Sequence, residues 1–249
     1  MKNLRPVADY RKLRLNNLCS DEFRHLLLLL YWPVYGLLFG YVERGYEAIM
    51  PILGLKYYPM YCRLDDLIPF NEWFLIPYLL WFAYIIGMLL YTLLYDIDGF
   101  RRMMYFTIFT YTVSLIFYFV FPTVQNLRPT TFENTNLLTR FIEHFYRFDT
   151  NTNVCPSVHV FGSFASTFAL SHARGLQKPV RKLTAHLLNV SICLSTVFLK
   201  QHSVLDIFVA LPFCLVGYLM FYVFPGSRKA SRAVTMQRSS TDGRTDLQI

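Results

Sequence analysis

Long stretches of apolar residues without a single charge are the feature that most constrains this chain. Residues 73–95 and 103–124 contain no Asp, Glu, Lys or Arg, and residues 26–42 form a shorter stretch of the same kind around Pro33. A helix that crosses the hydrocarbon core of a bilayer, about 30 Å thick, needs about 20 apolar residues. Charged residues make up 16% of the 249 residues, whereas about 25% is usual in soluble domains. The sequence therefore predicts a membrane protein.

Three further stretches extend this pattern, although they are more polar. Residues 157–173 and 183–199 carry histidines and several Ser and Thr residues, and residues 204–224 have Asp206 near their start. Buried helices of a soluble domain are the alternative reading, but the three cleaner stretches favour membrane helices here too. We therefore expect an all-α fold, a polytopic bundle of about six transmembrane helices that occupies residues 25–225.

The basic residues are distributed unevenly between the connections. Seventeen of the 24 Lys and Arg residues lie in residues 1–24, in the second and fourth connections, and in residues 226–249, and the other seven lie in the remaining connections. Because Lys and Arg are enriched on the cytoplasmic side, both tails are expected to be cytoplasmic. The C-terminal tail has few apolar residues and is expected to be disordered. This asymmetry explains the net charge of +8, so no nucleic-acid partner is expected.

This orientation brings polar residues from separate segments to the outer membrane level. Ionisable groups at membrane depth are costly and are therefore candidates for function. His202 and Asp206 are four residues apart, so on a helix the carboxylate can orient the imidazole as a nucleophile or base. A helix start offers free N–H groups to an anion, and Arg and Lys side chains bind phosphate oxygens. The candidate residues are Arg128, Ser157, His159, Lys200, His202 and Asp206.

Three short motifs carry a family resemblance. R-P at 128–129, P-S-V-H at 156–159 and S-T-V-F-L-K-Q-H-S-V-L-D at 195–206 resemble the three motifs of the type-2 phosphatidic acid phosphatase superfamily, in the same order, and the similarity covers about residues 122–210. The resemblance implies a phosphoryl transfer near the outer leaflet that uses no metal and no cofactor. His202 would attack phosphorus and form a phosphohistidine, Asp206 would orient it, and His159 would protonate the leaving oxygen. Arg128, Ser157 and Lys200 would hold the phosphate.

The motifs also depart from the family pattern. The family has Lys seven residues before the Arg of R-P, where this chain has Phe121, and Ser-Arg where this chain has Ser195-Thr196. The glycine of P-S-G-H is replaced by Val158. These changes resemble the inositol phosphorylceramide synthase-like branch, whose members move a phosphodiester head group between lipids. With two cations missing, we expect a lipid phosphodiester to be handled better than a monoester such as phosphatidic acid.

Several functions are compatible with these residues. The leading hypothesis is an integral-membrane lipid phosphatase or phosphotransferase whose partners are its lipid phosphate or phosphodiester substrate and the membrane lipids. The first alternative is a head-group transferase in which an alcohol replaces water, and the second is a non-catalytic lipid-binding protein. A transporter is disfavoured because the chain has no internal repeat. The lipid, the acceptor and the oligomeric state stay open.

The connections carry a few further expectations. Residues 123–155 are too polar to cross a membrane and are expected to form a loop with a short helix over the site. No cluster of metal ligands is visible, and Asp65 and Asp66 are expected to be solvated charges or helix-capping groups. Cys62 and Cys155 are expected to lie outside, where free thiols are favoured over a disulfide.

Overall fold

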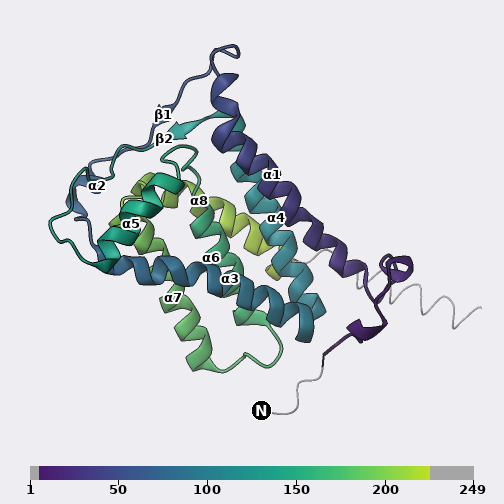
Figure 1. The fold of residues 1–249 in the computed structure, drawn as a ribbon. Coiled ribbons are helices and arrows are strands. Elements are labelled where there is room, and N and C mark those ends of the chain that lie inside the picture. Colours follow the sequence, from purple (N-terminus) through teal and green to yellow (C-terminus); the bar gives the residue numbers. More distant parts are fainter. Residues whose placement is uncertain (1–5, 225–249) are drawn as a thin grey trace, which may run out of the picture.

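The computed structural model describes residues 6–224, which form an almost entirely helical fold (Figure 1). Its α-helices are α1 (Tyr31–Arg44), α2 (Leu64–Leu67), α3 (Leu75–Tyr95), α4 (Ile97–Val120), α5 (Leu137–Phe148), α6 (Val158–His172), α7 (Pro179–Phe198) and α8 (Val204–Tyr218). Short 3₁₀ turns cover Tyr10–Lys12, Leu15–Asn17, Arg24–Leu30, Tyr46–Ala48 and Glu72–Phe74, and a π turn, Leu219–Val223, follows α8. Strands β1 (Tyr58–Pro59) and β2 (Thr123–Val124) pair in parallel.

Helix α6 lies in the centre of the bundle, in contact with α3, α4, α7 and α8. Its buried side chains are mostly small, which allows the neighbouring helices to approach closely. Gly162 shows this most clearly, because a Cβ atom there would lie 2.7 Å from Trp81 Nε1 and 2.8 Å from the Tyr111 hydroxyl. The glycine is therefore required by packing at the centre of the fold.

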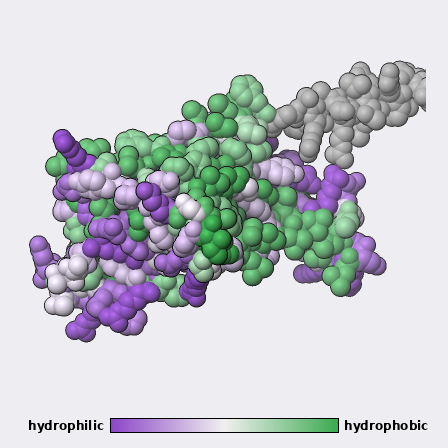
Figure 2. Space-filling model, turned by 90° about the horizontal axis from the view of Figure 1, so that it is seen from above, coloured by the Kyte–Doolittle hydropathy of each residue, from purple (hydrophilic) through white to green (hydrophobic). Residues whose placement is uncertain are grey.

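Four of the described helical segments are long and apolar enough to cross a membrane, namely Arg24–Arg44, Glu72–Tyr95, Ile97–Val120 and Val204–Val223. The expectation of six such helices is thus met in part. Helix α6 has 15 residues, about 22 Å of helix, and α7 has 20 residues but is not apolar enough. Helix α6 can be short and polar because it lies at the centre of the bundle, and a helix enclosed by protein does not need a lipid-compatible surface. Apolar side chains cover the central part of the face shown in Figure 2, and polar ones gather toward its left edge and on the lobe at its right.

The third apolar stretch has different bounds from those expected. Helix α4 begins at Ile97, before residue 103, because Asp96 caps it by accepting a hydrogen bond from Gly99 N at 3.1 Å. The helix ends at Val120, and residues 123–124, expected in the span, leave as strand β2. The capping carboxylate is a local signal that hydropathy alone does not register.

The connections gather at two ends of the bundle. At one end, Val7 N donates to Leu94 O at 2.9 Å, and Arg174 pairs with Asp96 and Asp98, so the N-terminal segment, the α3–α4 turn and the α6–α7 loop meet. At the opposite end lie β1, β2, α2 and α5 (Figure 1). These are the two groups of connections that the basic residues predicted. The expected tail of residues 226–249 lies outside the described residues.

Candidate active site

His202 and Asp206 lie at the start of α8 and contact each other directly. Ser203 caps the helix, its hydroxyl accepting from Leu205 N at 3.2 Å, and Asp206 Oδ2 accepts from Ser203 N at 3.1 Å. The same Asp206 oxygen lies 3.0 Å from His202 Nδ1. An ionised carboxylate only accepts hydrogen bonds, so this contact favours the neutral tautomer that has its proton on Nδ1 and its lone pair on Nε2. Asp206 is fully buried and His202 is 6% exposed, so Nε2 of His202 is oriented in a water-poor environment.

The second sequence motif brings two residues to this imidazole. Ser157 Oγ lies 3.3 Å from His202 Nε2, within hydrogen-bond reach of the free nitrogen. The ring centroid of His159, in the first turn of α6, lies 5.5 Å from that of His202. The His159 ring packs between Tyr78 and Trp81 of α3, with centroid distances of 4.5 Å and 4.6 Å. Ser157, His159, His202 and Asp206 therefore come together as the sequence predicted.

A small cavity of about 40 Å³ lies against the two histidines. It has room for about three water molecules. Besides the histidines, its wall includes two carboxylates, Glu43 at the end of α1 and Asp149 after α5. The full lining is Phe39, Glu43, Tyr118, Asp149, Thr150, Thr152, Asn153, Val154, Val158, His159, Gln201 and His202.

Arg128 lies close to this cavity but already has partners. Its Nη1 donates to Tyr146 O at 3.1 Å and Asp149 O at 2.9 Å, and its Nη2 donates to Thr150 O at 2.8 Å and Gln201 Oε1 at 2.5 Å. The guanidinium also lies over the ring of Tyr146, 4.6 Å from its centroid. Arg128 thus ties the end of α5 and the following loop to the residue before His202. The short helix expected over the site is α5, and Arg128 fastens it there.

Lys200 points away from the cavity. Its ammonium donates to the backbone oxygens of Asp65, at 2.7 Å, and Ile68, at 2.5 Å. The residue adopts φ 53°, a conformation unusual for a residue other than glycine, in the tight turn between α7 and α8. In the structure Lys200 therefore anchors this turn to the α2 segment and does not reach His202, so a phosphate contact has no support from its position.

Asp65 is a buried carboxylate whose contact with α8 the sequence did not predict. It is 2% exposed, and it accepts hydrogen bonds from Cys62 N at 2.8 Å, Ser203 Oγ at 2.7 Å and Val204 N at 2.8 Å. Of the two roles expected for it, the capping role is the one observed, but the helix that it caps is α8, far along the chain. Asp66 is exposed and accepts from the Tyr61 hydroxyl.

Burial shifts the pKa values of the charged groups around the cavity. It raises the pKa of Asp149, against the lowering effects of Arg128 and His202, and it lowers the pKa of Arg128, which Asp149 in turn raises. Burial also raises the pKa of the Cys155 thiol, and the nearby Asp206 carboxylate adds to this rise. Cys155 and Cys62 are both free thiols.

The sequence reading missed Glu43 and Gln201 as wall residues of the site. One signal was present for Glu43, because an acidic residue directly follows the first apolar stretch, at the end that is expected to face the histidine motifs. Within residues 6–224, no group of three or more His, Cys, Asp and Glu side chains could hold a metal ion.

Comparisons of this chain with protein-family models, with curated proteins and with solved structures found no match.

Proposed function

We propose that this chain is an integral-membrane enzyme that cleaves or transfers a lipid phosphate through a phosphohistidine. The observation that carries the proposal is the pair of contacts of His202, with Asp206 at Nδ1 and the Ser157 hydroxyl at Nε2. Such an imidazole is a prepared nucleophile. His159, whose Nδ1 has no hydrogen-bond partner within residues 6–224, stands beside it as the acid for the departing oxygen.

The reaction proceeds in two displacements. His202 Nε2 attacks phosphorus, the P–O bond to the lipid alcohol breaks, and that oxygen takes a proton from His159. Water or another alcohol then attacks the phosphohistidine, the P–N bond breaks, and His159 receives the proton of the attacking hydroxyl. Asp206 holds the imidazole in one tautomer throughout and stabilises the positive charge that it gains.

The charges of the cavity favour a substrate with a single negative charge. The two Nη atoms of Arg128 and the ammonium of Lys200 donate to protein oxygens, whereas Glu43 and Asp149 place carboxylates in the cavity wall. A phosphomonoester carries nearly two charges at neutral pH and a diester carries one. The diester therefore meets less repulsion, which supports the same preference that the missing Lys and Arg of the motifs suggested.

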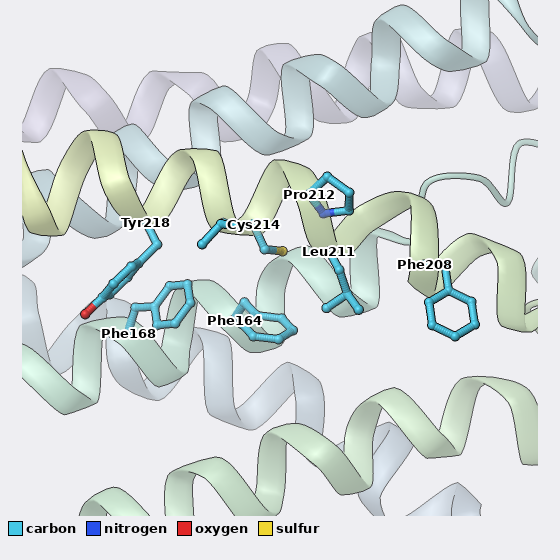
Figure 3. A pocket seen from close by; sticks show the side chains of 8 residues that line it. Phe164, Phe168, Phe208, Leu211, Pro212, Cys214 and Tyr218 are labelled. Carbon is cyan, nitrogen blue, oxygen red and sulfur yellow. The ribbon is translucent and has the colours of Figure 1, made fainter.

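An apolar groove supports a lipid substrate. A cavity of about 720 Å³ between α6 and α8 is lined by Phe164, Phe168, Phe208, Leu211, Pro212, Cys214, Leu215 and Tyr218. In Figure 3 the rings of Phe164 and Phe168 point from α6 toward α8, and Phe168 packs against Tyr218 with ring centroids 4.5 Å apart. Phe208 follows Asp206 by two residues in α8, so the groove begins about 3 Å further along the helix axis, on another side of the helix. An acyl chain of the substrate would lie there.

The membrane arrangement belongs to the same proposal. We place both termini in the cytoplasm and the site on the extracytoplasmic side, because of the basic residues at the end of the bundle that holds Arg174. Helices α6 and α7 would complete six spans, with α6 shielded from lipid by its neighbours. The non-catalytic alternative leaves the contacts of His202 without a purpose.

The proposal is tested with the purified full chain in detergent micelles. Lipid phosphomonoesters and phosphodiesters are supplied as a panel, and the products are identified by mass spectrometry. We expect release of the lipid alcohol, insensitivity to chelators, and a higher specificity constant for a diester than for phosphatidic acid. Absence of turnover on every lipid phosphate would reject the enzymatic function, and a strong preference for phosphatidic acid would reject the diester assignment alone.

A further inference from the structure

The side-chain amide of Gln201 is bonded at one end only. The residue is 3% exposed, and its Oε1 accepts from Arg128 Nη2 at 2.5 Å. Within residues 6–224 its Nε2 donates to no atom. A guanidinium has only donors, so the amide oxygen has to face Arg128 and the NH2 group is turned away from it. A buried donor without a partner costs stability, and this one therefore points to a ligand.

The turn between α7 and α8 holds this amide beside the proposed nucleophile. Gln201 directly precedes His202, and both residues line the small cavity. The backbone N–H groups of the two residues donate to the same oxygen, Thr196 O, at 2.9 Å and 3.1 Å. The Gln125 side chain donates to Lys200 O at 2.9 Å. These bonds fix the backbone of the turn, so the amide is in place before a substrate arrives.

Arg128 fixes the oxygen end of the same amide. Its Nη atoms also donate to the backbone oxygens of Tyr146, Asp149 and Thr150, and Arg128 is not among the residues that line the cavity. Gln201 is the partner that accepts through a side-chain amide. A hydrogen bond from a cation to an amide oxygen polarises the amide and makes its N–H groups stronger donors. The charge of Arg128 thus acts on the cavity through Gln201.

We propose that Gln201 is a further catalytic residue, whose Nε2 donates to a non-bridging oxygen of the phosphoryl group during its transfer to His202. The inference rests on the proposed function and adds a residue to it. The bond from His202 to phosphorus forms, the P–O bond to the lipid alcohol breaks, and that oxygen takes its proton from His159. Gln201 exchanges no proton. A donor that is already in place in a water-poor site stabilises the charge of the phosphoryl oxygens.

The size and the charge of the cavity agree with this contact. Its volume of about 40 Å³ has room for about three water molecules, and a phosphoryl group in transfer has three equatorial oxygens. The carboxylates of Glu43 and Asp149 lie in the wall, and ionised carboxylates only accept hydrogen bonds. A donor at Gln201 offsets part of their repulsion of a phosphodiester, which carries one charge.

The first test uses the purified full chain in detergent micelles and a phosphorothioate of phosphatidylethanol. Replacing either non-bridging oxygen by sulfur gives two diastereomers, and sulfur accepts hydrogen bonds only weakly. The wild type should release diacylglycerol about tenfold faster from the diastereomer that keeps oxygen at Gln201. Gln201→Met, which has no donor, should bring the ratio of the two rates close to one and lower turnover of the parent diester by about 10²-fold. Because the readout is a ratio within one preparation, partial misfolding does not change it.

The second test measures binding without turnover. Orthovanadate resembles the phosphoryl group in transfer, and the rise in melting temperature that it causes gives its dissociation constant. Gln201→Met should raise this constant about tenfold. Gln201→Glu keeps an oxygen for Arg128 and should keep the wild-type melting temperature without vanadate, yet it should bind vanadate no better than Gln201→Met, because a carboxylate only accepts.

Gln177→Met is the matched control in both tests. Gln177 is exposed in the α6–α7 loop, at the other end of the bundle, where its amide donates to Ala173 O at 2.8 Å. This variant should keep the wild-type rate ratio and the wild-type affinity for vanadate.

Other results would overturn the inference. Equal rate ratios in the wild type and Gln201→Met, or wild-type vanadate affinity in Gln201→Glu, would mean that Gln201 serves only as a partner of Arg128, while diacylglycerol release leaves the enzymatic function standing. No release from any diester, with vanadate binding that still depends on Gln201, rejects the enzymatic function and keeps the phosphoryl contact. No release and no vanadate binding reject both.

Discussion

Asp65 accepts a hydrogen bond from the Ser203 hydroxyl at 2.7 Å, although the two residues are 138 positions apart. The other oxygen of the carboxylate accepts from Val204 N at 2.8 Å, which satisfies a free N–H group in the first turn of α8. Ser203 N in turn donates to Asp206. A connection between α1 and α3 thus holds the turn that carries His202, and it does so through a buried charge.

Asp65→Asn is therefore expected to lower turnover per folded molecule by about tenfold to a hundredfold, because hydrogen bonds to a charged group contribute roughly 1.5–3 kcal/mol. The pH profile of turnover should change as well, since the Asp206–His202 contact loosens. Asp66→Asn, at the exposed neighbour, is the control and should leave both unchanged. A lower melting temperature with normal turnover would mean that Asp65 serves the fold alone.

His202→Ala is expected to abolish turnover, because the nitrogen that we propose to attack phosphorus is lost. Asp206→Asn should reduce turnover by about 10³–10⁴-fold, since an amide can donate to Nδ1 and select the wrong tautomer. Trapping with a ³²P-labelled substrate should give an acid-labile adduct in the wild type and none in His202→Ala. Near-normal turnover of His202→Ala would show that another group is the nucleophile.

Arg128→Gln is expected to loosen α5 and the loop that follows it, which lie over the candidate site. The guanidinium donates to carbonyl oxygens at Tyr146, Asp149 and Thr150, and a glutamine amide cannot reproduce these bonds. Limited proteolysis with chymotrypsin should cut α5 faster than in the wild type, by a factor of about ten for each 1.4 kcal/mol lost. Arg140→Gln, on the exposed side of α5, should keep the wild-type rate. Equal cleavage rates in the wild type and both variants would show that Arg128 does not hold α5 and the loop after it in place.

Asp149→Asn should stabilise the protein at neutral pH. Burial raises the pKa of Asp149 above its ordinary value of 3.8, so the folded state binds this proton more tightly than the unfolded state does. The charged form consequently lowers stability above the raised pKa, and the cost vanishes as pH falls below 3.8. The melting temperature of Asp149→Asn should therefore exceed that of the wild type at about pH 7 and approach it at about pH 3. If the difference in melting temperature between Asp149→Asn and the wild type grew toward acid pH, the expected direction of the pH dependence would be wrong.

The membrane orientation is tested with single cysteines at Asn134 and Lys178, exposed residues near opposite ends of the bundle. In intact cells, an impermeant thiol reagent should label Asn134→Cys strongly and Lys178→Cys weakly, since the basic connections are expected inside. Permeabilised cells provide the control, where both should react. The reverse pattern would move the site to the cytoplasmic side.

The sequence by itself predicted the helical membrane character, the two groups of connections and the four residues that the structure brings together at the candidate site. Hydropathy and charge are additive along the chain, so apolar stretches and basic loops can be read without coordinates. The four-residue spacing of His202 and Asp206 is likewise a local property, and it led directly to the observed contact at 3.0 Å. Ser157 and His159 followed because motif order and span direction set their level in the bundle.

The tertiary structure decided which charged groups face the cavity. Lys200 is close to His202 in sequence, yet its ammonium donates to the backbone oxygens of Asp65 and Ile68. The side chain is turned that way because Lys200 adopts a left-handed backbone conformation, φ 53°, in the turn between α7 and α8. Glu43 enters the site from α1 and Asp65 caps α8 from α2. These contacts join segments more than 100 residues apart, and their direction depends on how helices pack around α6. No local pattern encodes that packing, since it is the sum of many side-chain shapes at once.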